Sequence, residues 1–242
     1  MTQRIIRTDS DGLCTLTLNR PDKLNALDTA TFAELDAILE SLEAETETVG
    51  CVVMRGSGRG FCAGADLGAI DTTLGDYKPR IIDRLARLPQ PTIAAIHGVC
   101  LTGGLELVLA CDFIIADETA RFADTHGKWG LVGAWGMIQR LPRRIGAAAA
   151  RGMMLTSRMV GAAEAKAMGL IDVLAGPEGL DAALAELTDS ILANSWYTNR
   201  HTKRIMLETD GMPLDQALIR ERETYPGFAP DYNERVARFT KK

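Results

Sequence analysis

The sequence predicts a mixed α/β fold, because short apolar runs typical of β-strands alternate with segments whose apolar residues have a helical spacing. The composition agrees with this prediction: the chain has 242 residues, of which 46% are hydrophobic and 24% charged, as in an ordinary globular enzyme. A barrel of eight strand–helix units is also compatible with this length, but the strand-like runs are too few for eight units.

The expected strands are rich in β-branched or apolar residues and are bounded by Gly, Asp, Asn or Pro. They cover residues 13–19, 50–56, 92–98, 111–117 and 170–176. Between them, apolar residues recur at intervals of three and four, which predicts amphipathic helices. The two clearest sets are Phe32, Leu35, Leu39 and Leu42, and then Leu180, Leu184, Leu187 and Ile191. The first helix follows Asp28 and carries a capping-box-like pair, Thr31 and Glu34.

From about Asn194 onward no strand pattern remains. Three short helical patterns follow, separated at Gly211–Pro213 and at Pro226–Gly227. We therefore divide the chain into a core domain, residues 1–193, and a helical region, residues 194–242. Helices this short can barely form a core of their own, so we expect them to pack on something else, for which an oligomer interface is a natural candidate.

Bulk properties exclude several classes of protein. The net charge of −5 disfavours a dedicated nucleic-acid binder. No apolar run approaches the roughly 18 residues needed to cross a membrane, and the first residues lack the apolar core of a signal peptide. Five cysteines without a CxxC pair predict buried thiols in a reducing cytosol. With three histidines and no HExxH spacing, no metal site is predicted.

The first glycine-rich segment, residues 55–67, follows an expected strand. Gly58, Gly60 and Ala63 satisfy the dinucleotide-binding spacing GxGxxA. Such a site also needs a sustained helix and a second strand, whereas the following segment is polar and reaches Pro79. We therefore favour a loop whose backbone approaches a ligand closely, because Gly and Ala present little bulk.

The second glycine-rich segment contains an isolated carboxylate. Glu106 lies in the apolar run of residues 105–110, a predicted helix that is entered through Gly103 and Gly104. A capping box would need Ser or Thr at position 103, and a solvent-exposed helix face would not be apolar on both sides of Glu106. A chemical role for Glu106 is the better interpretation.

These segments together resemble the enoyl-CoA hydratase/isomerase (crotonase) family. The resemblance extends from about residue 10 to residue 240, in the same order as in the family. It rests on LTLNRPDKLNALD (16–28), GRGFCAGADL (58–67), HGVCLTGGLELVLACD (97–112), MLTSRMVGAAEAKAMGLIDVL (154–174) and ERVARFTKK (234–242).

The resemblance implies a spiral of ββα units topped by C-terminal helices that make trimer contacts and close the site, in a homotrimer or a dimer of trimers. It implies an acyl-CoA substrate, with coenzyme A as part of the substrate and no other cofactor. The thioester oxygen would accept hydrogen bonds from the amides of Ala65 and Gly103, an oxyanion hole. Glu106 matches the first of two catalytic carboxylates. The positions that match the CoA site are Lys23, Ala63, Asp66 and Leu67.

The second catalytic carboxylate of the hydratases is replaced by His126 in this chain. Three functions stay open: an enoyl-CoA hydratase or isomerase that uses Glu106 and His126, a non-catalytic acyl-CoA binder, and a C–C hydrolase of β-diketones, which has a histidine here. Those hydrolases carry an aspartate nine residues later, where this chain has Trp135. A turn in which Asp124 only fixes the imidazole is a further alternative. Possible acyl-pocket residues are Trp129, Trp135 and Met137.

Overall fold

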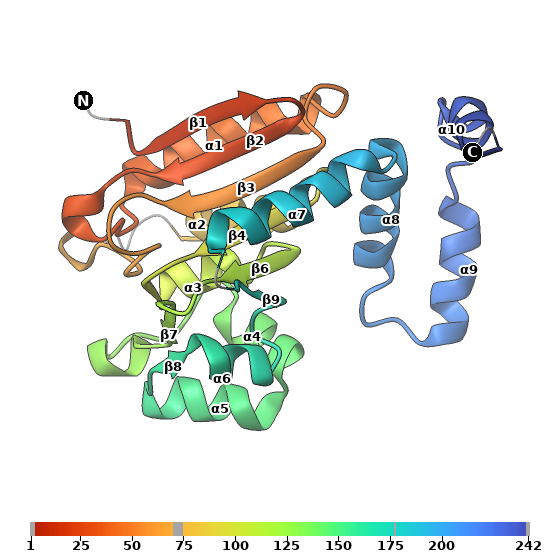
Figure 1. Cartoon of the computed structure of the whole chain (residues 1–242). Coiled ribbons are helices and arrows are strands. Elements are labelled where there is room, and N and C mark those ends of the chain that lie inside the picture. Colours follow the sequence, from red (N-terminus) through yellow and green to blue (C-terminus); the bar gives the residue numbers. More distant parts are fainter. Residues whose placement is uncertain (1–2, 70–74, 177, 241–242) are drawn as a thin grey trace.

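The computed structural model describes residues 3–69, 75–176 and 178–240. Its main sheet has six strands in the order β1-β2-β3-β4-β6-β9 (Figure 1). These are β1 (Ile5–Ser10), β2 (Leu13–Leu18), β3 (Cys51–Gly56), β4 (Thr92–Ile96), β6 (Phe113–Ala116) and β9 (Val173–Leu174). β1 and β2 form an antiparallel hairpin, and every other neighbouring pair is parallel.

The main sheet is covered on both faces, which explains why its central strands β3, β4 and β6 are mostly apolar and buried. In β3, Val52 and Met54 belong to the larger core, together with residues of α1 (Thr29–Ala44) and α2 (Tyr77–Ala86). Cys51 and Val53 point to the opposite face, where they pack against α7 (Leu180–Ala193). Figure 1 shows α7 lying across the front of the sheet and α1 behind it.

A smaller sheet forms below the first. It contains β5 (Val99–Leu101), β7 (Arg121–Ala123) and β8 (Val160–Gly161) in the order β5-β7-β8. Around it lie short helices that complete the lower part of the core in Figure 1. They are α3 (Gly103–Val108), α4 (Met137–Ile145), α5 (Ala147–Thr156) and α6 (Ala162–Ala167), with 3₁₀ turns at Pro21–Lys23, Leu67–Ala69 and His126–Trp129.

The mixed α/β prediction is confirmed, and each predicted strand contains an observed one. β1 was not predicted because most of its side chains are exposed and polar, as suits an edge strand. The polar segment was expected to end at Pro79, but a helix already begins before this residue: α2 starts at Tyr77, and Pro79 lies in its first turn, where a missing N–H costs little. The glycine-rich segment itself opens no long helix, so the dinucleotide-binding context is absent from these residues.

The capping box predicted for α1 is also wrong. Asp28 is the N-cap, and its Oδ1 accepts hydrogen bonds from the Thr31 amide at 2.8 Å and the Thr31 hydroxyl at 2.7 Å. Glu34 turns away from this end of the helix and instead accepts from the amides of Arg4 (2.8 Å) and Ile5 (3.0 Å). Glu34 thus fixes β1 to α1, a long-range contact that the local sequence pattern could not reveal.

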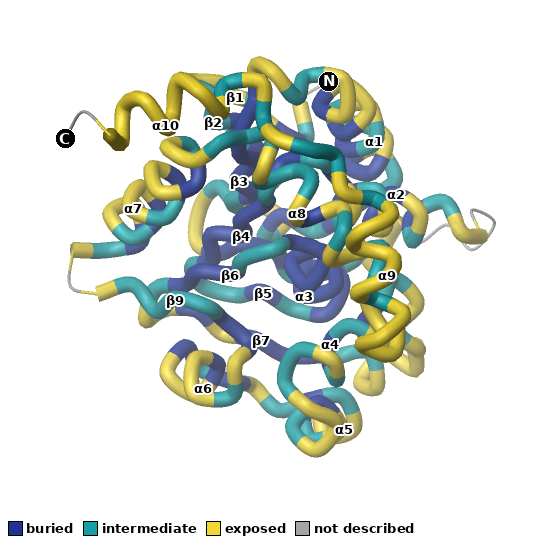
Figure 2. The backbone as a smooth tube through the Cα atoms, turned by 90° about the vertical axis from the view of Figure 1, so that its right-hand side faces the viewer, coloured by how far each residue is buried: buried dark blue, intermediate teal, exposed yellow. Residues whose placement is uncertain are grey.

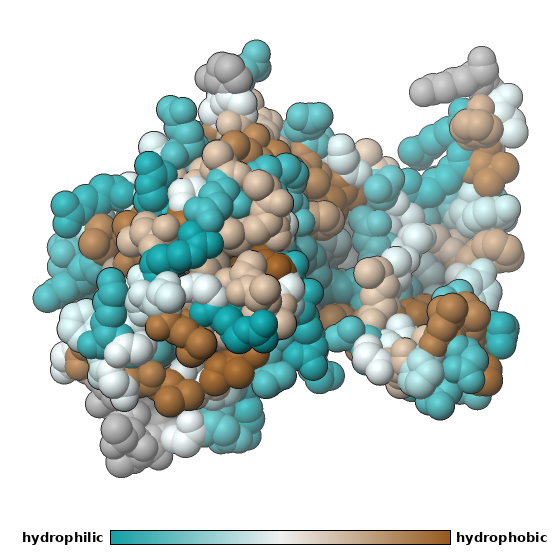
Figure 3. Space-filling model, turned by 90° about the horizontal axis from the view of Figure 1, so that it is seen from below, coloured by the Kyte–Doolittle hydropathy of each residue, from teal (hydrophilic) through white to brown (hydrophobic). Residues whose placement is uncertain are grey.

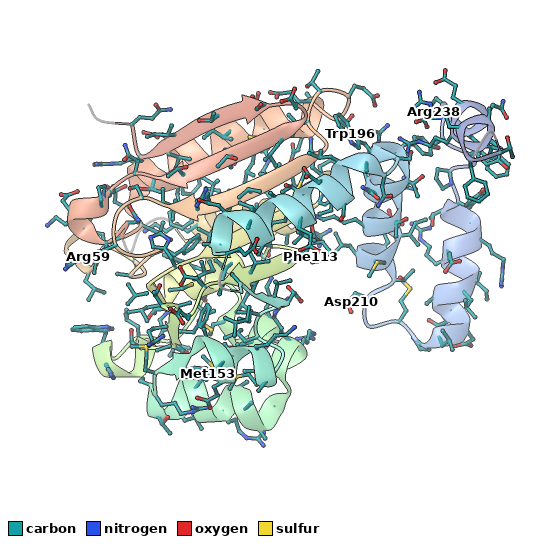
Figure 4. The ribbon with its side chains drawn as sticks, viewed as in Figure 1. Arg59, Phe113, Met153, Trp196, Asp210 and Arg238 are labelled. Carbon is teal, nitrogen blue, oxygen red and sulfur yellow. The ribbon has the colours of Figure 1, made fainter. Side chains whose placement is uncertain are left out.

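Three helices follow the predicted boundary at residue 193, where α7 ends: α8 (Trp196–Thr209), α9 (Leu214–Thr224) and α10 (Tyr232–Thr240). They stand to one side of the core and are largely exposed (Figures 1 and 2). Trp196, at the corner between α7 and α8, packs so closely on Gly12 and Gly50 that a Cβ there would lie 2.5 Å or less from its ring (Figure 4). No helix among the described residues is long and apolar enough to cross a membrane.

Asn25 organises the loop that precedes α1. The residue is 2% exposed and has a left-handed backbone with φ of 55°, which asparagine tolerates better than most residues. Its side-chain amide lies 2.8, 2.9 and 3.0 Å from the carbonyl oxygens of Ser57, Gly60 and Phe61. Asn25 therefore holds the first glycine-rich segment in position.

We expect Asn25→Ala to lower the free energy of unfolding by about 2–4 kcal/mol, because it leaves buried carbonyls without donors and removes a residue suited to positive φ. Urea denaturation measures the change. Asn19→Ala is the matched control, since Asn19 makes a single exposed hydrogen bond, to the Gln3 carbonyl at 3.1 Å. Equal stability of the two variants would contradict this role of Asn25.

Candidate active site

Three extended segments end side by side at the site. β5 and β7 pair in parallel, with Leu101 opposite Ala123, and Cys62 forms a parallel bridge to Cys100 on the other side of β5. Because the carboxyl ends of parallel strands meet at one edge, the residues that follow these strands converge there. This register brings the segment after Cys62, the start of α3, and the turn after β7 together.

Glu106 is buried in α3, with 1% of its surface exposed. Its Oε1 accepts hydrogen bonds from the backbone amides of Trp135 (2.8 Å) and Met137 (3.1 Å), at the start of α4. Its Oε2 lies 3.6 Å from Nε2 of His126. One carboxylate oxygen is therefore fixed by the main chain, and the other faces the imidazole.

His126 is held from its far side by Asp124. The two atoms Nδ1 of His126 and Oδ1 of Asp124 lie 2.6 Å apart, and the same oxygen accepts from the His126 amide at 3.0 Å. Asp124 is itself buried. Since a carboxylate can only accept, Nδ1 carries the proton and Nε2 is directed toward Glu106. Asp124 does fix the imidazole, as the turn interpretation predicted. The imidazole is held with its Nε2 atom toward Glu106.

Burial raises the pKa of Glu106 above its usual range, although the amides of Met137 and Trp135 and the charge of His126 act in the opposite direction. Burial alone would lower the pKa of His126. The hydrogen bond to Asp124 and the nearby charge of Glu106 outweigh it, so this pKa lies above its ordinary value of 6.5. Both shifts move the two groups toward the neutral pH range in which proton transfer is most effective.

The amides of Ala65 and Gly103 lie close together near Glu106. A Cβ built on Gly103 would lie 3.2 Å from the Ala65 nitrogen and 2.5 Å from the Trp135 ring, so only glycine fits here. Gly64, with φ of 106°, allows the same close approach from the other segment. Among the described residues, no oxygen accepts a hydrogen bond from either amide. Two N–H groups are thus available to a ligand.

A cavity of about 650 Å³ opens beside these groups. Its lining is mostly apolar, and hydrophobic side chains also reach the surface on this lower side of the core (Figure 3). The predicted site residues that line it are Ala63, Ala65, Leu67, Gly103, Glu106, His126, Trp129 and Trp135. Its size suits an acyl chain rather than a whole coenzyme A molecule.

Three predicted residues do not line this cavity. Lys23 is exposed in the 3₁₀ turn before α1. Asp66 binds the Arg20 guanidinium at 2.9 Å and caps the Gly68 amide. The placement of Met137 in the acyl pocket does not agree with the structure: as the first residue of α4, it is fully buried in the main core and contributes its amide to Glu106 instead.

Sequence reasoning missed two parts of the site. Lys78 of α2 lines the cavity although it is only 7% exposed, and no local pattern marks a lysine in a polar segment as buried. Thr102 and Thr125 join the turns that carry Glu106 and His126 through their hydroxyl groups, and the Thr125 amide donates to the Thr102 hydroxyl at 3.2 Å. No sequence signal marked this contact, because β5 and β7 have only three residues each and show no periodic pattern.

Comparison with known proteins identifies the family of this chain. Residues 8–231 match the model of the enoyl-CoA hydratase/isomerase family. A probable peroxisomal enoyl-CoA hydratase 1 of Arabidopsis thaliana is 36% identical, over 90% of this chain and 83% of its own length. The 1,2-epoxyphenylacetyl-CoA isomerase of Escherichia coli is 33% identical, over 100% of this chain and 97% of its own.

Solved structures show the same similarity. The crystal structure of an enoyl-CoA hydratase from Bacillus anthracis superposes with a TM-score of 0.93, at 31% identity, and the match covers 99% of this chain and 96% of that one. This chain therefore belongs to the enoyl-CoA hydratase/isomerase family and is an enzyme of the hydratase/isomerase type.

Proposed function

We propose that the protein catalyses the hydration of an enoyl-CoA thioester, or the closely related shift of its double bond. The observation that carries this proposal is the position of Glu106. Its carboxylate is buried and fixed by two backbone amides, and its second oxygen points to a histidine. The amides of Ala65 and Gly103 in the same cavity have no acceptor among the described residues.

The amides of Ala65 and Gly103 form the oxyanion hole in this proposal. The carbonyl oxygen of the thioester accepts both hydrogen bonds and becomes negative as an enolate forms. Donors held rigidly by the backbone need no reorganisation at that moment, and each is worth roughly 10²–10³-fold in rate. The glycine at position 103 and the turn at Gly64 allow the oxygen to reach both donors.

Glu106 acts as the base and His126 as the acid. In hydration, Oε2 of Glu106 takes a proton from water as the water oxygen bonds to the β carbon, and protonated His126 gives its Nε2 proton to the α carbon of the enolate. A water within hydrogen-bond reach of both groups fits the 3.6 Å between Oε2 and Nε2. In isomerisation the same two groups remove and return a proton on the carbon chain.

The two other functions have less support. A carrier without catalysis does not need a buried carboxylate with a raised pKa beside an oriented imidazole. The β-diketone hydrolase would need a carboxylate at position 135, and Trp135 there packs edge-on against Phe32 with ring centroids 5.0 Å apart. The two aromatic rings form an apolar surface at the position where the hydrolase would need a carboxylate.

We assign the CoA portion to the mouth of the cavity. Ala63 and Leu67 line it and leave space for the pantetheine arm, and exposed Lys23 is available to a CoA phosphate. Asp66 serves indirectly, through its ion pair with Arg20, which also binds the loop around Asp28. All five cysteines are buried free thiols, which suits the reducing cytoplasm.

We further propose that α8–α10 assemble the protein into trimers or pairs of trimers. Large apolar side chains on these helices and on the segment between α9 and α10 are exposed in the single chain, more than a monomer needs to show. They include Met206, Leu214, Ile219, Phe228, Val236 and Phe239.

Glu106→Gln is expected to reduce crotonyl-CoA hydration by a factor of about 10³ or more, because the amide keeps the hydrogen bond from the main chain but cannot take a proton. Hydration is followed by the loss of enoyl absorbance. Binding of a saturated acyl-CoA, measured by calorimetry, should change little. Unchanged turnover in this variant would refute the assignment of the base.

The pH profile is expected to have two limbs. Activity should fall below a pKa that lies above the usual 4.5 of glutamate, as Glu106 is protonated, and above a pKa higher than 6.5, as His126 loses its proton. Asp124→Ala should move the alkaline limb to lower pH, and NMR titration of the imidazole should show the same shift. Asp124→Asn, which retains an acceptor, should move it less.

The interaction of His126 with Asp124 also makes the free energy of unfolding depend on pH. The pKa of His126 is raised in the folded state, so its stabilising contribution is complete below about pH 6.5 and disappears as the pH rises through the folded-state pKa. A titration of His126 that is identical in wild type and Asp124→Ala would show that Asp124 does not act on the imidazole.

Light scattering after size exclusion should give three or six times the chain mass of 26.2 kDa. Leu214→Asp combined with Phe228→Asp should shift the protein toward monomers, because each carboxylate would be buried in the interface. Leu155→Asp is the control, since Leu155 is 79% exposed on α5, far from the C-terminal helices. A wild-type monomer would refute the assembly.

A further inference from the structure

Lys78 places a positive charge inside a cavity that is otherwise mostly apolar. The residue lies in the first turn of α2, is 7% exposed and lines the same cavity as Glu106. Lysine is almost never buried to this extent without a partner for its charge, because removing an ammonium group from water costs several kcal/mol. Its position therefore needs an explanation that the reaction at Glu106 does not provide.

The contacts of Lys78 within the described residues are aromatic. Its Nζ lies 5.7 Å from the ring centroid of Phe32 and 5.7 Å from that of Trp135. Two rings at this distance orient the ammonium group and recover only part of the lost hydration. No carboxylate among the described residues lies within 4.0 Å of Nζ, in contrast to buried Lys203, which binds Asp112 at 2.6 Å.

The side chain of Trp135 lies next to both Gly103 and Lys78. This indole lies against Gly103, where a Cβ would meet its ring at 2.5 Å, and it also lies beneath the Lys78 ammonium. The Lys78 ammonium and the backbone of Gly103 therefore lie beside the same indole ring. An acyl group whose carbonyl oxygen is held by that amide extends a few carbons before its end comes within reach of Lys78.

We propose that the preferred substrate is a thioester whose short acyl chain ends in a second carboxylate, which binds Lys78. The inference rests on the proposed function, since it takes the thioester carbonyl to be at Ala65 and Gly103. A carboxylate would complete the hydrogen bonding of the ammonium in a site of low polarity, where a charge-assisted hydrogen bond is strongest. An acyl chain ending in a methyl group would leave that charge without a carboxylate partner among the described residues.

A phosphate of coenzyme A is a poor occupant for this position. Lys78 is buried beside the rings of Phe32 and Trp135, whereas the CoA phosphates are bulky, strongly hydrated groups that suit the exposed mouth of the cavity. Lys128 also lines the cavity but is exposed, as expected for a residue near that mouth. The two lysines thus make a matched pair, one buried and one exposed, for testing which part of the substrate Lys78 recognises.

The experiment compares trans-2-hexenedioyl-CoA with trans-2-hexenoyl-CoA, two esters of equal chain length that differ in the terminal group. For the wild type we expect kcat/KM to be at least about tenfold higher for the dicarboxylic ester, the effect of one charged hydrogen bond. Lys78→Met should remove this preference, so that the ratio of kcat/KM for the two esters falls to about one. Lys78→Arg should keep the preference, and so should Lys128→Met.

The outcomes separate this inference from the proposed function. Turnover of neither ester by the wild type would overturn both proposals, whereas equal turnover of the two would overturn only the role of Lys78. The wild-type comparison does not depend on the folding of any variant. Inhibition by free coenzyme A provides the second readout: a much weaker inhibition of Lys78→Met would show that Lys78 binds the CoA portion, and this too would overturn the inference.

Discussion

The burial of the Glu106 carboxylate is the constraint on which the site depends. A charged group that is 1% exposed must have fixed polar partners, and here the amides of Trp135 and Met137 supply them. The two amides in turn need Glu106 as their acceptor, because they stand at the beginning of a helix, where no intrahelical acceptor exists. Glu106 therefore anchors the loop before α4, and the same loop forms the wall of the cavity.

Sheet topology explains why groups far apart in the sequence meet at this carboxylate. The parallel pairing of β5 with β7 places Thr102 beside the start of the Asp124–His126 turn, and the Thr102 amide donates to the Ala123 carbonyl at 2.9 Å. A shift of this register by one residue would reverse the direction of every side chain that follows. The 3.6 Å between Glu106 and His126 is thus a consequence of backbone hydrogen bonds in the small sheet.

How much could be predicted from the sequence follows from the range of each interaction. Glu106 was recognisable because a carboxylate in an apolar helix contradicts its local environment, and the central strands were recognisable because most of their residues are apolar. β5 and β7 have three residues each, too few for a periodic pattern. The burial of Lys78 and the inward direction of Met137 depend on which helices pack together, and local sequence holds no information on that.

For Asp124, the local contact could be predicted from the sequence, but the long-range contact could not. A spacing of two residues predicted its contact with His126, since such turns are local. That the fixed imidazole faces Glu106, and so takes part in one chain of three groups, depends on the pairing of β5 with β7.

His126, where the resemblance leads us to expect a second carboxylate, changes the electrostatics of the site. Two carboxylates at this distance would repel each other and also repel the enolate that forms beside them. Here an imidazole stands between Glu106 and Asp124, and each carboxylate favours its protonated form. The trio Glu106, protonated His126 and Asp124 carries one net negative charge, and its positive member faces Glu106. Under the proposed function, such a site gives up part of the activation of water that a second carboxylate would provide, and it gains a proton donor held at a fixed angle. The proposed function therefore favours steps in which proton delivery to carbon limits the rate.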